Sequence, residues 1–357
     1  MMDKKANGGN FWRFSDYVEE VSQIVNQNKL TLKFATIKAM LKAAKDIVNL
    51  FDNWEKQNLV CLDNLKTSFY FDMQSGELDF RSKNMIVGYG YQASGNIQID
   101  EMTASEIING SETTYNVYTQ RWKLAVVLFE FFYHNDGPYK GADSMMRVYY
   151  SKDEEYQWMA KEGIFNMEDE YCKNHTVHGV QDRLNKYWWY FPEILRVCFT
   201  QTFVSYKENP QGRFSAYDWK IILNQVESEY IDCICGKKGF AEEFLNKEKR
   251  QHICPRCGRN FYRFTDGCSD IYLSTNTIIK KKEIYSKIPD DDTPFGIVVE
   301  NTKQKGLFGI KNISNEGWLG KYPNGDIKEI VPGGGIPIWQ GLELEFHNGS
   351  KWLIKEV

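Results

Sequence analysis

Two close pairs of cysteines constrain the fold of this chain more than any other feature. Cys233 and Cys235 are followed, 18 residues later, by Cys254 and Cys257, and a glycine comes directly after each pair. Paired cysteines on two tight turns are the usual ligand arrangement of tetrahedral zinc. We therefore expect these four thiolates to bind Zn²⁺. Four protein ligands leave no open coordination position, so the expected zinc is structural rather than catalytic.

Two alternatives accompany this expectation. The C-x-C spacing of the first pair is tighter than the usual C-x-x-C, which leaves His252 and Cys268 as alternative ligands. Basic residues also surround the cysteines, so nucleic-acid binding that involves Lys249, Arg250 and Arg256 is an alternative function. The whole chain argues against a nucleic-acid partner, because its 48 acidic and 44 basic residues give a formal net charge of −4.

The 357-residue chain as a whole is expected to be a cytoplasmic, multidomain α+β protein. No apolar run is long enough to span a membrane, and residues 1–10 hold no apolar signal-peptide core. Apolar periodicity predicts helices over 31–53, 121–133, 188–203 and 215–226, with a loop region over 84–115. Short apolar segments between turns predict a small β-sandwich at the C-terminal end. The expected domains are 11–228 (helical), 229–270 (zinc ribbon), 271–293 (linker, from its like-charge runs) and 294–357 (β-sandwich).

Residues 12–226 resemble the large lobe of a protein kinase in two stretches. Arg121–Glu130 is almost wholly apolar and precedes Gly137-Pro-Tyr-Lys-Gly141. This order resembles the buried helix after a kinase activation segment and its "G-x-x-P-Y/F-x-G" loop. Asn209–Trp219 is similar to the "P-x-x-R-P-S-A-x-E-W" run near a kinase C-terminus. The resemblance implies a kinase large-lobe-like domain over residues 11–228.

The same resemblance implies one structural ion pair. Met102–Glu106 sits where kinases have their A-P-E motif, whose Glu pairs with the Arg of the later run. We therefore expect a Glu106–Arg213 pair, in which the planar guanidinium holds the carboxylate with two bonds. The alternative is that these are two exposed, unrelated charges.

The catalytic positions of the family are poorly matched. Asp63 occupies the position of the catalytic base, and Ser68 replaces the magnesium-binding Asn. Asp79, in Asp79-Phe80-Arg81, imitates D-F-G slightly early, and Gln120 replaces the Asp that opens the buried helix. Too few residues precede Phe11 for a small lobe with its phosphate-covering loop. Phosphoryl transfer depends on positioning and charge compensation, so we expect Asp63, Ser68 and Asp79 to be vestigial and Mg-ATP not to bind, unless another chain supplies the small lobe.

Residues 294–357 resemble a reduced forkhead-associated-like domain. The run Gly306–Ser314, then Trp318 and Gly341–Phe346, carries the resemblance. Such domains bind phosphothreonine peptides through loop residues, but the Arg-Ser-His signature is not visible here. Lys311, Asn312 and Ser314 are the candidate ligand-binding loop; the alternative is that Asn312 and Ser314 stabilise a turn.

Together, these parts resemble the kinase-like members of bacterial tellurium-resistance-type stress and phage-defence clusters. The resemblance implies a catalytically inactive signalling scaffold, a pseudokinase, that binds partner proteins. The partner classes it implies are a von Willebrand factor A-type protein and a metal-dependent phosphatase. An active Ser/Thr kinase that uses Asp63 and a nucleic-acid-binding zinc ribbon are the rival hypotheses.

Overall fold

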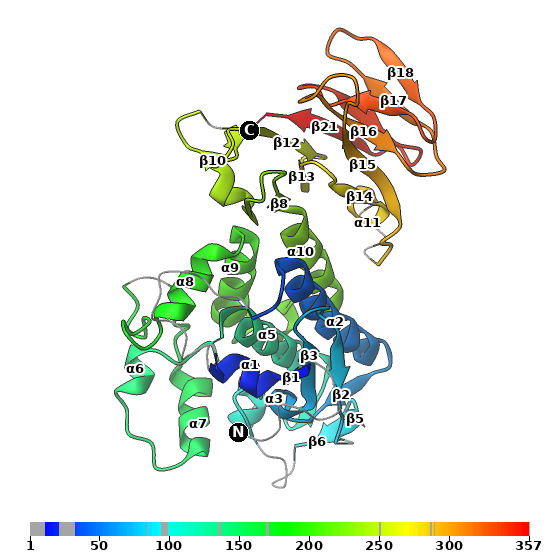
Figure 1. Ribbon diagram of the computed structural model, residues 1–357. Helices are drawn as coiled ribbons and strands as arrows, with labels where there is room; N and C mark the ends of the chain where they lie inside the picture. The colour runs from blue at the N-terminus through cyan, green and yellow to red at the C-terminus, as the bar shows by residue number, and fades with distance from the viewer. Residues whose placement is uncertain are drawn as a thin grey trace. The chain divides into compact units, whose positions relative to one another are not determined.

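The computed structural model describes residues 11–20, 33–83, 85–93, 99–134, 137–168, 171–249, 251–285, 288 and 290–356. The chain divides into two compact units, Met1–Leu223 and Asn224–Val357. We call them the helical unit and the β unit (Figure 1). Helices and sheets are therefore both present, but largely in different units. Within the described ranges, no helix has the length and apolar character needed to cross a membrane.

The helical unit consists mainly of α-helices joined by short strands. Its helical elements are α1 (Phe14–Glu20), α2 (Ile37–Lys56), α3 (Leu65–Ser68), α4 (Ser105–Ile108), α5 (Val117–Tyr133), α6 (Ala142–Met145), α7 (Lys152–Glu162), α8 (Asp182–Tyr190), α9 (Glu193–Thr200), η2 (Gln201–Ser205), η3 (Pro210–Gly212) and α10 (Ala216–Ser228), which continues into the β unit. Its strands are β1 (Phe11–Arg13), β2 (Leu59–Cys61), β3 (Phe69–Asp72), β4 (Leu78–Phe80), β5 (Ile86–Gly88), β6 (Tyr91–Gln92) and β7 (Thr114–Tyr115). They form a β1-β3-β4 sheet and the pairs β2-β5 and β6-β7, all antiparallel.

Helix α5 forms the core of this unit and contacts α1, α2 and α8 (Figure 1). Asn116 begins it, because its side chain accepts hydrogen bonds from the N–H groups of Tyr118 and Thr119. Residues 122–133 are all buried, as expected for a helix that is apolar nearly all round. The helix ends at His134, which has a left-handed φ of 50°.

The hairpin of β3 and β4 packs closely on α2 at Gly76. This glycine has a φ of 75°, and a Cβ atom there would lie 1.9 Å from the carbonyl oxygen of Ala39. Only glycine fits both the turn and the contact. The hairpin is thereby fixed beside the segment that carries Asp63.

Three expectations for this unit need correction. The single helix predicted over 188–203 is broken, because Pro192 cannot continue a helix and its predecessor Phe191 is extended. The helix predicted over 31–53 begins later, at Ile37, where Thr36 caps it. The loop region predicted over 84–115 contains β5, β6, α4 and β7 in its described part.

The β unit consists of antiparallel strands. They are β8 (Tyr230–Asp232), β9 (Lys238–Phe240), β10 (Leu245–Asn246), β11 (Gln251–Ile253), β12 (Asn260–Thr265), β13 (Asp270–Leu273), β14 (Ile278–Lys280), β15 (Pro294–Glu300), β16 (Phe308–Asn312), β17 (Trp318–Lys321), β18 (Ile327–Ile330), β19 (Gly335–Pro337), β20 (Glu343–Glu345) and β21 (Lys351–Lys355). Two short helices, η4 (Ala241–Phe244) and α11 (Lys281–Ile284), lie between them. One sheet has the order β10-β11-β12-β21-β20-β17-β18, with β13 also paired to β12, and a second has the order β14-β15-β16-β19.

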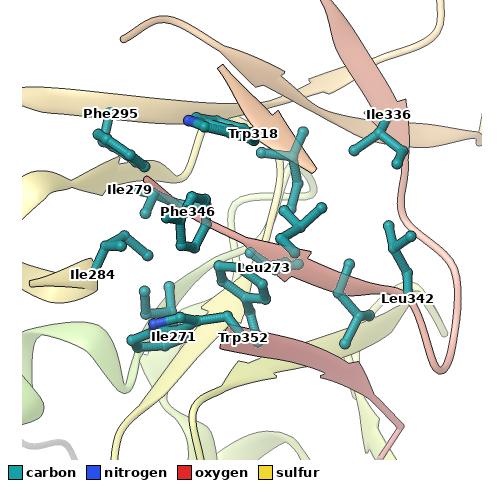
Figure 2. Packing of buried hydrophobic residues seen from close by; sticks show 14 of the residues in the cluster. Ile271, Leu273, Ile279, Ile284, Phe295, Trp318, Ile336, Leu342, Phe346 and Trp352 are labelled. Carbon is teal, nitrogen blue, oxygen red and sulfur yellow. The ribbon is translucent and has the colours of Figure 1, made fainter. Parts of the chain in front are cut away.

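Side chains from both sheets share one apolar core (Figure 2). The aromatic rings of Phe295, Trp318 and Phe346 pack face to face or edge to face, with ring centres 5.2–5.4 Å apart. The labelled aliphatic side chains in Figure 2 surround these rings and Trp352. The core is large enough to hold the two sheets together.

The boundaries expected within this unit differ from the structure. Strand β21 pairs with β12, so the cysteine segment and the C-terminal strands share a sheet rather than forming separate modules. The expected linker over 271–293 contributes β14 and α11, and buries Ile279 and Ile284 in the shared core. Its charge runs neutralise each other, because Lys282 Nζ lies 2.6 Å from Asp292 Oδ1.

Candidate functional site

The four predicted cysteines converge at one end of the β unit. Cys233 and Cys235 follow β8, and Cys254 and Cys257 follow β11. Their sulfur atoms all lie within 4.8 Å of one another. The Sγ atoms of Cys233 and Cys257 are 3.6 Å apart, and those of Cys235 and Cys254 are 3.5 Å apart. A tetrahedron with zinc–sulfur bonds of about 2.3 Å has edges of about 3.8 Å, so the cluster has the dimensions of a four-thiolate metal site.

Both cysteine turns are closed by backbone hydrogen bonds of the same kind. The N–H of Cys233 donates to the carbonyl of Lys237, and the N–H of Cys254 donates to that of Arg259. The second turn is one residue longer, which accommodates the extra residue of C-x-x-C. Glycines with positive φ, Gly236 and Gly258, complete the turns.

The electrostatics of the cluster favour the thiolate form of Cys254. Burial opposes ionisation of Cys254, but backbone N–H groups of Arg256 and Cys257 donate to its sulfur and lower its pKa to about 7. Burial instead raises the pKa of Cys233 to about 12. Because a metal ligand must be a thiolate, cation binding to this cluster would release protons.

The two alternative ligands lie outside the cluster. The His252 ring packs on Tyr272, with ring centres 4.8 Å apart, and burial lowers the pKa of His252 to about 4. Cys268 is exposed on the turn after β12. Within the described residues, neither belongs to a group of converging metal-ligating side chains.

Asp63, which the resemblance to kinases puts at the position of the catalytic base, is held inside the fold. Its side chain is only 2 % exposed. Carboxylate Oδ2 accepts a hydrogen bond from Ser82 Oγ at 2.8 Å and from the Lys83 N–H at 3.1 Å. The Asp63 carbonyl accepts from Lys123 Nζ at 2.7 Å, which also donates to the Cys61 carbonyl.

Ser68, Asp79 and Gln120, the other positions compared with kinases, have surroundings of their own. Ser68 is fully buried at the end of α3. Asp79 lies on β4, where its carboxylate pairs with Arg81 at 2.8 Å. Gln120 is buried, and its side-chain oxygen accepts from the Cys61 N–H at 3.3 Å. Of the three, Gln120 holds the backbone of β2.

Glu106 and Arg213 form a buried, two-bonded ion pair. Arg213 Nη1 lies 2.6 Å from Glu106 Oε1, and Nη2 lies 2.9 Å from Oε2. The Arg213 side chain is 1 % exposed. The pair connects α4 to the segment between η3 and α10.

The candidate loop of the C-terminal strands is arranged for a turn. Asn312 is fully buried and donates to the carbonyls of Glu316 and Ile330. Its side-chain oxygen accepts from the N–H and hydroxyl of Ser314. Lys311 is exposed on β16. The polar atoms of Asn312 are therefore used within the turn between β16 and β17.

The sequence reasoning missed the residues that hold Asp63. Ser82 lies 19 positions away and Lys123 lies 60 positions away, so no local spacing marks either contact. A lysine on the buried part of a mostly apolar helix was the available signal for Lys123. Arg250, a candidate for nucleic-acid contact, lies outside the described residues.

No known protein-family model matches the sequence, and no curated protein matches it either.

Proposed function

We propose that this chain is a catalytically inactive, kinase-like adaptor whose β unit is stabilised by a structural zinc ion. The observation that carries the proposal is the state of Asp63. A catalytic base must reach the hydroxyl of a bound substrate. The Asp63 carboxylate is instead buried and accepts hydrogen bonds from Ser82 and Lys83. Its role is to hold the segment between β2 and α3.

The residues at the positions of the kinase metal ligands are also poorly suited to neutralise the charge of a phosphate. Phosphoryl transfer requires metal ligands that hold magnesium against the phosphates. The position of the metal-binding Asn is the buried Ser68, and the carboxylate of Asp79 is paired with Arg81. Ser82, close to where the D-F-G Asp would fall, is a hydrogen-bond donor to Asp63 and not a carboxylate.

The zinc component rests on the cysteine cluster. Four sulfur atoms with tetrahedral spacing would be the ligands of Zn²⁺, and such a site supplies stability and no open coordination position. Two arginines of this segment are used internally: Arg263 pairs with Asp270, and Arg259 donates to Thr275. Lys249 and Arg256 are exposed, so the nucleic-acid alternative rests on these two residues in the part of the chain that the structure describes.

The partner proteins belong to the proposal as well. The resemblance described above points to a von Willebrand factor A-type protein and a metal-dependent phosphatase. Protein binding is the activity left to a kinase-like fold that lacks a usable base and metal ligands.

The test of the structural role of Asp63 is a comparison of two substitutions. Asp63→Ala leaves the Ser82 hydroxyl and the Lys83 N–H without their acceptor, so the free energy of unfolding should fall by about 1–3 kcal/mol. Asp79→Ala removes an exposed carboxylate and should change it by less than about 0.5 kcal/mol. Urea denaturation measures both. If Asp63→Ala keeps full stability but abolishes phosphate transfer to a protein substrate, the chain is a kinase.

A further inference from the structure

An open groove of about 940 Å³ lies in the helical unit and is lined by residues of α8, α9, η2 and the segment after α7. Its volume is at the upper end of the range of about 300–1,000 Å³ for small-ligand pockets. Trp189 and Val197 line the groove, with 67 % and 50 % of their surface exposed. Exposed aromatic and aliphatic side chains in a groove are typical of binding sites.

The charges that line this groove are unbalanced. Glu168 and Glu193 are exposed, and neither has an ion-pair partner within the part of the chain that the structure describes. Arg196 lines the same groove, but its Nη1 donates to the carbonyls of Trp188 and Phe191 at 3.3 and 2.7 Å. The guanidinium also lies 5.0 Å from the centre of the Trp189 ring. Arg196 offsets one of the two carboxylates, and the other leaves the charged side chains of the lining with a net negative charge that attracts cations.

A buried acceptor in the groove points in the same direction. Asn166 lines the groove and is 2 % exposed. Its side-chain nitrogen donates to the Lys140 carbonyl at 2.7 Å, which fixes the orientation of the amide. Its Oδ1 has no hydrogen-bond partner in the described residues. A buried carbonyl oxygen without a donor is costly, and a ligand N–H that displaces the side chains covering it would satisfy it.

We propose that this groove binds a basic peptide segment of a partner protein, in which arginine alternates with aliphatic residues. The arginine guanidinium supplies N–H donors for Asn166 and charge for Glu168 and Glu193, and it can stack on Trp189. The aliphatic residues pack on Val197. A free amino acid would fill only a part of the groove. The inference deepens the adaptor function and rests on it, because it gives the chemistry of the partner.

The test measures the fluorescence anisotropy of a dye-labelled peptide in which Arg alternates with Leu, added to the full chain. We expect saturable binding that weakens as salt is added. Replacing each Arg by citrulline, which has nearly the same shape but no charge, should reduce the affinity about tenfold or more. Replacing each Arg by Glu should abolish binding.

Variants connect the binding to the groove. Trp189→Ala should weaken binding about tenfold and Glu193→Gln about threefold. The matched controls are Trp339→Ala, which removes a tryptophan that is 62 % exposed in the β unit, and Glu77→Gln, which removes an exposed carboxylate of the β3–β4 turn. Both should bind the peptide like the unmodified chain. Thermal melts of each variant identify any loss of folding.

Three results would overturn the inference: no saturable binding, equal binding of the citrulline peptide, or equal loss of affinity in the control variants. Competition by free arginine amide with the affinity of the peptide would also overturn it, since the occupant would then be a small cation. Failure of the proposed adaptor function can be told apart from failure of this inference, because nucleotide binding near Asp63 is measured without the peptide. A chain that binds both would be a kinase with a docking groove.

Discussion

At the scale of single residues, Arg213 shows how fully a buried side chain can be hydrogen-bonded. All five of its N–H groups have acceptors: the two oxygens of Glu106 and the carbonyls of Tyr118, Tyr206 and Lys207. Its guanidinium also lies 4.7 Å from the centre of the Trp122 ring. A planar group with a fixed fork of donors is required for such an arrangement.

Arg213→Lys should therefore be strongly destabilising although it keeps the charge. A lysine has one ammonium group and cannot satisfy Glu106 and three carbonyls, so the free energy of unfolding should fall by about 3 kcal/mol. Urea denaturation measures the loss. Arg81→Lys is the matched control, since the Arg81–Asp79 pair is exposed, and it should cost less than about 1 kcal/mol. Equal effects of the two substitutions would contradict the structural role of the buried pair.

Residues differ in how far the sequence could predict their roles. The cysteine cluster was predictable, because its ligands come in pairs on two turns and the spacing within each pair is local. The contact of Ser82 with Asp63 was not, because it depends on how the β3–β4 hairpin packs. Asn312 is intermediate: its use in a turn was one of two readings of the sequence, and only the buried carbonyls of Glu316 and Ile330 show where its amide donates.

At the scale of elements, apolar periodicity predicted α5 and most of α2, since both bury a continuous apolar surface. It failed where a polar segment is ordered by its own charges. Helix α11 is such an element: Glu283 caps it by accepting from the Lys280 N–H at 2.6 Å. Lys280 and Lys282 share the carboxylates of Glu227 and Asp292. Because lysines of the basic run pair with Asp292 of the acidic run, the segment is folded and is not a solvated linker.

The cap of α11 gives a pH prediction. Burial raises the pKa of Glu283 to about 7 from an ordinary value of 4.5. Between these two values the folded chain keeps a proton that the unfolded chain loses, so this group lowers stability as the pH rises. Glu283→Gln is neutral at every pH and keeps an acceptor for Lys280. Relative to the unmodified chain, it should gain about 1–3 kcal/mol between pH 5 and pH 8.

Urea denaturation at several pH values measures this difference. A gain that is already complete at pH 5, or a difference that does not change with pH, would show that Glu283 is ionised in the folded chain.

At the scale of the whole molecule, two units replace the domains that the sequence suggests. The pairing of β12 with β21 joins segments far apart in the chain, and no local pattern marks it. The cysteine cluster therefore belongs to a unit that is larger than a small independent zinc ribbon. Its buried neighbours, Ile231, Phe244 and Phe261, pack directly against Cys233 and Cys254.

Metal removal should consequently affect the β unit. We expect elemental analysis to find one zinc per chain, and Cys254→Ser to lose it, because a structural zinc site contributes its binding free energy to folding. Cys268→Ser is the matched control, as this exposed cysteine lies outside the cluster. A chelator should lower the thermal stability of the unmodified chain and leave that of Cys254→Ser unchanged. Zinc retained in Cys254→Ser would show that other ligands bind it.

The proposed function requires that the helical unit does not bind nucleotide. The most direct measurement is the thermal melting of the zinc-loaded chain with and without Mg-ATP, because a ligand that binds only the folded state raises the melting temperature. We predict no change, in the unmodified chain and in Asp79→Ala alike. A magnesium-dependent increase that disappears in Asp79→Ala, an exposed substitution expected to fold normally, would contradict the claim and show that a nucleotide site survives.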